Sequence, residues 1–151
     1  TAWHDRGHSC ISLRMKKQII TALEKYGKVL ITSETELPGE FRRYRYHFPP
    51  HQMHSLLAGA ELLFSESASM AAEAAVLGVP SIFIDDTGRG YTRELEHKYG
   101  LLSNFGESDA EISRALIKTV ELLKRDDLRK EWERRRRWML EDREVWRFGD
   151  V

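Results

Sequence analysis

The sequence predicts an α/β fold, a doubly wound parallel sheet with helices on both faces. Strand-like and helix-like segments alternate along the chain, which is typical of this class. The strand-like segments are short and continuously apolar, as expected of strands that are buried on both faces. The chain has 151 residues without an internal repeat or a low-complexity linker, so residues 1–151 are predicted to form one domain.

Five segments are predicted as strands because short apolar or β-branched runs lie between turn residues. They are residues 28–32, 44–48, 61–65, 81–84 and 101–104. The second is a weak strand or an extended loop, because Pro49 and Pro50 follow it directly. Pro38 and Gly39 mark a turn before it.

Six segments are predicted as helices, from apolar residues at helical spacing or from capping residues at their ends. They are residues 12–26, 51–58, 67–77, 91–99, 109–124 and 127–141. Gly27, Gly78 and Gly100 each stand close behind one of these segments and are expected as C-terminal caps.

Composition excludes several classes of function. Lys plus Arg and Asp plus Glu each number 24, so a neutral chain offers no bulk attraction for nucleic acid, and no nucleic-acid partner is expected. The apolar runs are much shorter than the roughly 18 residues that span a bilayer. Cys10 is the only cysteine, so an internal disulfide is impossible, and a reduced, cytoplasmic location is expected.

The first residues predict a fragment of a longer protein. The chain opens on Thr1 instead of methionine and continues into a polar stretch that has no apolar core of a signal peptide. We expect that the first strand of the domain and a whole preceding domain are missing.

A serine-rich turn between a strand and a helix is the most informative segment. Ser67, Ala68 and Ser69 follow the strand 61–65 and open the next helix. Free N–H groups and the helix dipole favour an anion there, and small side chains let a phosphate approach the backbone. The structural alternative is an ordinary serine N-cap.

Glu73 lies one turn further into that helix, among alanines. Its carboxylate can accept hydrogen bonds from two vicinal ribose hydroxyls. The structural alternative is stabilisation of the helix dipole, worth about 0.3–1 kcal/mol.

Two histidine-containing groups suggest acid–base or metal chemistry. His4 and Asp5 lie in the polar opening stretch and are the candidate catalytic residues. The second group is His47, His51 and His54, of which the last two share a helix face when three residues apart. Neither group has the ligand spacing of a recognisable zinc site, so no metal is expected and exposed polar positions are the alternative.

The loop 85–91 follows the third apolar strand and has two acids, two glycines and an arginine. We expect Asp85 and Arg89 to contact the hydroxyls of a sugar or a phosphate. The structural alternative is a simple turn and helix cap.

Four consecutive arginines, 134–137, stand in the last predicted helix among tryptophans and acidic residues. Consecutive residues point all round a helix, so a solvated, ion-paired helix is expected. The alternative is a docking surface for a missing domain or a peripheral contact with anionic lipid. Patterns of P-loop, dinucleotide-binding and nucleophile-elbow enzymes are absent.

The segment 72–84, AEAAVLGVPSIFI, resembles the donor-binding, C-terminal half of GT-B-fold enzymes that use nucleotide sugars. Related members are UDP-N-acetylglucosamine 2-epimerase and the N-acetylglucosaminyltransferase that forms lipid II. A longer pattern is similar to a further archaeal and bacterial family, whose activity is unassigned. It runs through 4–5, 26–29, 31–34, 49–50, 53–54, 65–80 and 98–101.

The resemblance implies a Rossmann-like domain that binds a nucleotide sugar, with a UDP-sugar as substrate and no cofactor. In the better understood relatives the matching glutamate, here Glu73, binds the ribose, and the helix start before it binds the diphosphate. The loop from about Phe48 to Met53 is implied to contact the uracil, and the loop 85–91 the sugar. The parent protein would transfer or epimerise a sugar in cell-surface polysaccharide synthesis, and the fragment alone would be inactive. The alternative is a non-catalytic binding or interaction domain that keeps the fold.

The opening stretch departs from both relatives. The transferase has a glycine-rich loop where this chain has residues 4–9, and the epimerase has a histidine motif that His4 only loosely matches. Neither the reaction nor a catalytic residue therefore transfers.

Overall fold

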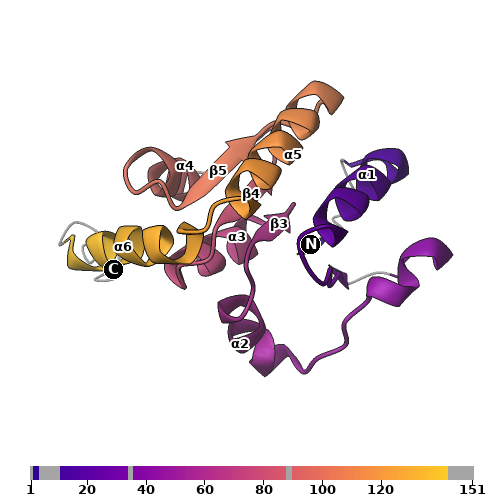
Figure 1. Cartoon of the computed structure of the whole chain (residues 1–151), viewed down its shortest axis with the longest axis horizontal. Coiled ribbons are helices and arrows are strands. Elements are labelled where there is room, and N and C mark those ends of the chain that lie inside the picture. Colours follow the sequence, from indigo (N-terminus) through magenta and orange to yellow (C-terminus); the bar gives the residue numbers. More distant parts are fainter. Residues whose placement is uncertain (1, 4–10, 34–35, 88–89, 143–151) are drawn as a thin grey trace.

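The computed structural model describes residues 2–3, 11–33, 36–87 and 90–142. Its strands form one parallel five-stranded sheet in the order β2-β1-β3-β4-β5 (Figure 1). The bounds are β1 Ala2–Trp3, β2 Thr32–Ser33, β3 Leu63–Ser65, β4 Ser81–Ile84 and β5 Leu102–Phe105. This confirms the predicted α/β class with a parallel sheet.

Helices cover both faces of the sheet, as the apolar strands require. They are α1 Leu13–Glu24, α2 Met53–Ala58, α3 Ala68–Val76, α4 Gly90–His97, α5 Asp109–Leu123 and α6 Leu128–Glu141, with 3₁₀ turns η1 Gly39–Tyr44 and η2 Pro50–Gln52. Helices α1 and α5 pack against each other, whereas α3 packs against α2 and α4. The two groups take opposite sides of the strands, which is the doubly wound arrangement (Figure 1).

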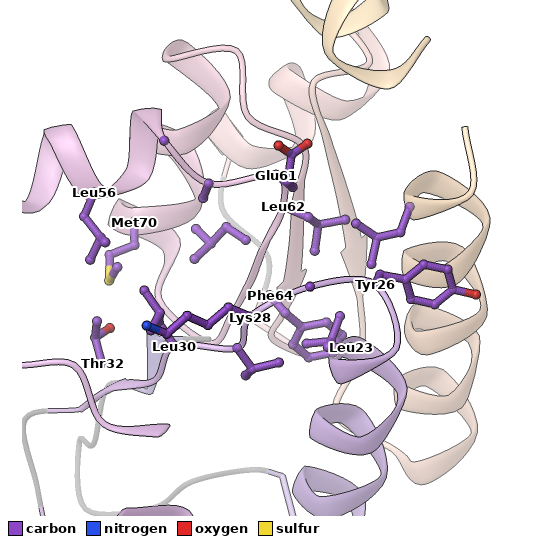
Figure 2. Close-up of a pocket in the computed structure, with 16 residues that line it drawn as sticks. Leu23, Tyr26, Lys28, Leu30, Thr32, Leu56, Glu61, Leu62, Phe64 and Met70 are labelled. Atoms are coloured by element: carbon purple, nitrogen blue, oxygen red, sulfur yellow. The ribbon is translucent and has the colours of Figure 1, made fainter. Parts of the chain in front are cut away.

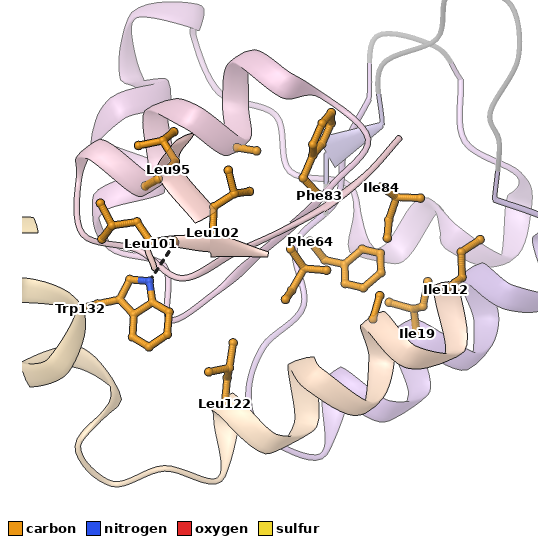
Figure 3. Close-up of a cluster of buried hydrophobic side chains, with 14 of the residues drawn as sticks. Ile19, Phe64, Phe83, Ile84, Leu95, Leu101, Leu102, Ile112, Leu122 and Trp132 are labelled. Carbon is orange, nitrogen blue, oxygen red and sulfur yellow. Dashed lines mark hydrogen bonds between the residues drawn. The ribbon is translucent and has the colours of Figure 1, made fainter. Parts of the chain in front are cut away.

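The core lies between the sheet and these helices. Phe64 and Ile84 are buried and face Ile19 of α1 and Ile112 of α5, while Phe83 points to the opposite side of the sheet (Figure 3). Full burial of each of these side chains stabilises the fold by about 1.5–3 kcal/mol. The central strands β3 and β4 are therefore buried on both faces, which explains why they do not alternate between apolar and polar residues.

The start of the sheet differs from the expectation. We expected no strand before residue 12, yet Ala2–Trp3 forms β1, between β2 and β3. The strand predicted over 28–32 is shorter and later, because β2 is Thr32–Ser33 and pairs with those two residues of β1. A strand is assigned through its partners, and the two described residues of β1 pair with Thr32 and Ser33.

The segment predicted as a weak strand or extended loop over 44–48 makes one isolated parallel bridge, between Arg45 and Ile31. The N–H of Ile31 donates to the carbonyl of Tyr44, and the N–H of Tyr46 donates to the carbonyl of Ile31. This segment thus flanks β2 on its outer side.

Two of the three predicted glycine caps are confirmed. Gly78 and Gly100 have φ of 79° and 65°, the left-handed conformation that ends a helix. Gly27 is a correction: α1 ends on a right-handed Lys25, and the φ of Gly27 is not positive.

The last helix, α6, crosses the amino ends of neighbouring strands. Trp132 is buried and its Nε1 donates to the carbonyl of Leu101, directly before β5, at 2.9 Å. Arg129 pairs with Glu61, just before β3, at 2.9 Å. Helix α6 therefore closes the edge of the sheet that is opposite to the carboxyl ends of the strands.

The run of arginines is used for this docking. The Nε of Arg136 donates to the carbonyl of Val76, at the end of α3, at 2.8 Å. Arg135 donates to the carbonyl of Gly100, behind α4, at 2.6 Å. Both contacts place a cation at the negative end of a helix dipole, which is favourable. Arginines of the run also pair with acidic residues of α6 itself, three and four positions away.

Candidate functional site

The order of the strands reverses between β1 and β3. The chain passes from β1 to β2 on one side, and β3, β4 and β5 follow on the other side. Ala2 of β1 is paired with Ser65 of β3, so the carboxyl ends of these strands are neighbours. Open α/β sheets bind ligands at such a reversal, beyond the carboxyl ends of the strands. The serine-rich turn that follows Ser65 lies at this point.

Ser65 and Ser67 shape the turn from β3 into α3. The hydroxyl of Ser65 accepts the N–H of Ser67 at 2.8 Å and donates to its carbonyl at 3.2 Å. Ser67 is the N-cap of α3, and its hydroxyl accepts the N–H of Met70 at 3.3 Å. Both serines are buried. The hydroxyl of Ser67 thus caps α3, which is the structural alternative. A contact of Ser67 with a phosphate stays a prediction.

Ala68 and Ser69 form the first turn of α3, where N–H groups have no partner inside the helix and the dipole is positive. Ala68 is half-buried and Ser69 is exposed. Of the two predicted hydroxyl contacts, the one at Ser69 is open to a ligand.

Glu73 lies in the middle of α3, with 43% of its side chain exposed. Its Oε2 lies 4.0 Å from Nδ1 of His54, which comes from α2. The packing of Leu57 of α2 with Met70 of α3 in one apolar cluster holds the two helices together. The sequence suggests each residue separately but not the pair, because no spacing rule connects two helices that meet only in the fold.

Phe48 is half-buried and its ring stacks on that of Tyr46, with centroids 5.7 Å apart and planes 24° from parallel. Tyr46 is exposed. Sequence reasoning missed Tyr46, although aromatic residues two positions apart in an extended segment lie on one side of the chain and signal such a pair. Together the rings form an aromatic surface that leads into η2 and α2.

Asp85 is engaged in its own loop. Its carboxylate accepts the N–H and the hydroxyl of Thr87, each at 2.8 Å. The neighbouring Asp86 accepts the N–H of Glu107, behind β5, at 2.7 Å. Residues 85–87 thus form an Asx turn tied to the end of β5, and the contact of Asp85 with a sugar or a phosphate stays a prediction. Arg89 lies outside the described residues.

The candidate catalytic residues His4 and Asp5 also lie outside the described residues. Within the described ranges, His, Cys, Asp and Glu side chains form no group of three that could hold a metal. His47 and His51 are exposed there. Helices of this part of the chain are too short or too polar to cross a bilayer.

Comparison with known proteins supports the fold. No protein-family model matches the sequence, and no curated protein matches it. In structure the chain is similar to the glycotransferase of kitacinnamycin, solved by crystallography, with a TM-score of 0.58 at 16% sequence identity over 90% of this chain. The fold is glycosyltransferase-like. The match spans 38% of the length of that enzyme, so it concerns a Rossmann-like half of a GT-B architecture.

Three of the predicted site residues, Ala68, Ser69 and Glu73, lie on one helix, α3. Ala68 and Ser69 begin α3 at the switch point, and Glu73 lies further along α3, beside His54 of α2. This set can hold an anion at the helix start and accept hydroxyl groups at the carboxylate.

Proposed function

We propose that this domain binds a nucleotide sugar, most simply a UDP-sugar, for a glycosyltransferase- or epimerase-like protein of cell-surface polysaccharide synthesis. The proposal is carried by one observation. The start of α3, with exposed Ser69, stands at the switch point of a glycosyltransferase-like sheet, and half-exposed Glu73 follows on the same helix. Ligands of open α/β sheets bind at this point.

The chemistry of these groups suits a nucleoside diphosphate. The N–H groups and the dipole of α3 attract the diphosphate, and Ser69 adds a hydroxyl donor. Glu73 accepts the two ribose hydroxyls, and the stacked rings of Tyr46 and Phe48 offer an aromatic face for the base. Such preorganised dipoles would also stabilise the diphosphate as it leaves the sugar.

The roles of the remaining predicted residues follow from the resemblance. Asp85 and Arg89 would orient the sugar, and His4 or Asp5 would supply acid–base chemistry. GT-B active sites lie between two domains, so a preceding acceptor domain is proposed as the partner of this one.

The proposal is tested by calorimetric titration with UDP and with UDP-N-acetylglucosamine. We expect both to bind and Glu73→Ala to weaken both by about tenfold or more, because a hydrogen bond to a charged group is worth about 1.5–3 kcal/mol. Glu121→Ala is the matched control, since Glu121 is an exposed glutamate on α5. Equal affinity of the wild type and Glu73→Ala would refute the role of Glu73.

The second candidate is a non-catalytic binding or interaction domain. It is favoured by the internal use of two predicted contacts, since the hydroxyl of Ser67 caps α3 and the carboxylate of Asp85 closes its own loop. A folded domain that binds neither nucleotide would support this candidate against the first.

A further inference from the structure

Glu73 of α3 faces a histidine that comes from a neighbouring helix. Nδ1 of His54, in α2, lies 4.0 Å from Oε2 of Glu73. The side chain of His54 is 68% exposed and that of Glu73 is 43% exposed, so a ligand can reach both. The candidate ribose site therefore has a second polar group beside its carboxylate.

Apolar packing beneath this pair holds the two helices together. Leu57 lies three positions after His54 on α2, and Met70 lies three positions before Glu73 on α3. Residues three positions apart are neighbours on the surface of a helix. Leu57 and Met70 are buried in one cluster, and Leu56 points to the same apolar pocket as Met70 (Figure 2). The packing of α2 on α3 thus places His54 opposite Glu73.

The separation of the two polar atoms suits a shared ligand atom. A hydrogen bond from an N–H to an oxygen spans about 2.7–3.2 Å, which is shorter than the 4.0 Å between Nδ1 and Oε2. Two atoms at this separation can both lie about 2.8–3.0 Å from one hydroxyl oxygen. A hydroxyl both donates and accepts, so it can donate to the carboxylate of Glu73 and accept from an N–H of His54. The pair is therefore complementary to a hydroxyl group.

The elements around the pair distinguish the two hydroxyls of a ribose. The start of α3, which is proposed for the diphosphate, carries Ser69 one turn before Glu73. The aromatic surface of Tyr46 and Phe48, which is proposed for the base, leads into α2 and so to His54. In a nucleotide the 2′ hydroxyl is next to the carbon that bears the base, whereas the 3′ hydroxyl lies on the side of the phosphate. His54 is therefore on the side of the 2′ hydroxyl.

We propose that His54 is a specificity-determining residue of this site, whose Nδ1–H donates to the ribose 2′ hydroxyl while that hydroxyl donates to Oε2 of Glu73. The inference rests on the proposed nucleotide site and adds to it a preference for ribonucleotides over 2′-deoxyribonucleotides. A ligand without the 2′ hydroxyl leaves the donor of His54 and one oxygen of Glu73 without a partner. The 3′ hydroxyl binds to Glu73 alone.

The test measures the affinities of the 151-residue chain for UDP, 2′-deoxy-UDP and 3′-deoxy-UDP by calorimetry. We expect the wild type to bind UDP about tenfold or more tightly than 2′-deoxy-UDP. In His54→Ala this ratio should fall by about fivefold, whereas the ratio of UDP to 3′-deoxy-UDP should not change. His54→Asn should restore the preference, because its side-chain amide supplies an N–H donor near the position of Nδ1.

His97→Ala is the matched control. Nε2 of His97 also lies beside a glutamate, 3.9 Å from Oε2 of Glu96, but this pair is on α4, close to the amino end of β5. The change should leave all three affinities as they are in the wild type.

Three outcomes would overturn the inference. An unchanged ratio of UDP to 2′-deoxy-UDP in His54→Ala, with UDP binding that still depends on Glu73, would refute it and leave the proposed function in place. Equal weakening of both ligands in His54→Ala would show that His54 acts on the shape of the site and not on the 2′ hydroxyl. No binding of UDP by the wild type would refute both the inference and the proposed function.

Discussion

Arg136 and Val76 are sixty residues apart in sequence and are joined by a 2.8 Å hydrogen bond, from the guanidinium Nε to the carbonyl at the end of α3. The same helix reaches Leu101 through Trp132 and Glu61 through Arg129. Helix α6 thus contacts the end of α3 and the residues that come just before β3 and β5. The arginine run was expected to pair with ions along a solvated helix, and two of its members, Arg135 and Arg136, in addition dock that helix on the carbonyls of Gly100 and Val76.

Trp132 is a buried residue of α6 that takes part in this docking. Trp132→Phe keeps an aromatic ring but leaves the buried carbonyl of Leu101 without its donor, so we expect a loss of about 1–3 kcal/mol in the free energy of unfolding. Urea unfolding measures it. Ile117→Ala, at an exposed position of α5, is the control and should change stability by less than about 0.5 kcal/mol. Equal effects of the two changes would contradict the structural role of Trp132.

Glu131 gives the stability of α6 a dependence on pH. Two hydrogen bonds lower the pKa of Glu131 from 4.5 to about 2: the one from Arg134 has the larger effect, and the one from Arg135 the smaller. The unfolded chain therefore takes up this proton before the folded one does. The stabilisation is fully present above about pH 4.5 and is lost as the pH falls towards 2.

The measurement compares the wild type with Glu131→Gln by unfolding at a series of pH values. We expect the difference in stability to be constant above about pH 5 and to decline from pH 4.5 towards 2. A difference that does not change with pH would show that the carboxylate of Glu131 makes no charged contact with its arginines.

Gly78 is expected to resist substitution. Its φ of 79° costs a residue with a side chain about 1–2 kcal/mol, and an added Cβ would come within 3.0 Å of Cδ of Arg136. Gly78→Ala should therefore lower the melting temperature by several degrees, at about 2–4 °C per kcal/mol. In Gly27→Ala the new methyl group meets nothing within 4 Å, so this variant should be neutral or slightly stabilising. The same loss in both variants would contradict the argument.

Substitutions of Ser67 and Ser69 are expected to have different effects, on stability for Ser67 and on ligand binding for Ser69. Ser67→Ala removes the N-cap of α3 and should lower the free energy of unfolding by about 0.5–2 kcal/mol. Ser67→Gly should lower it by only a few tenths of a kcal/mol. Exposed Ser69→Ala should leave stability unchanged and weaken the binding of UDP. Unfolding curves and calorimetry on the same three proteins decide this. Weaker UDP binding by Ser67→Gly alone would reverse the two roles.

Local sequence was sufficient for those parts of the fold that local chemistry determines. The strand β4 was predicted at its observed bounds, and Ser67 was placed next to the start of a helix because serine caps and small residues mark such starts. Gly78 and Gly100 were predicted as caps because a left-handed residue ends a helix most easily as glycine.

The parts that depend on distant partners were not predicted. The bounds of β2 follow from the two residues of β1, not from the apolar run 28–32 itself. The pair of His54 and Glu73 exists because α2 packs on α3. The carbonyls that Arg135 and Arg136 bind belong to helix ends far away in sequence, so only a tertiary structure shows that these arginines are needed there.

Because α6 is the last described element of the chain, its contacts with the sheet form late during synthesis. During synthesis the segments before β3, β4 and β5 leave the ribosome well before Trp132 does, and chains grow at about 5–20 residues per second. For that interval of seconds the site for Trp132 beside Leu101 is open to water and to other chains. The nascent domain completes these contacts only when α6 has been made, so chains interrupted within this helix would keep the site beside Leu101 exposed.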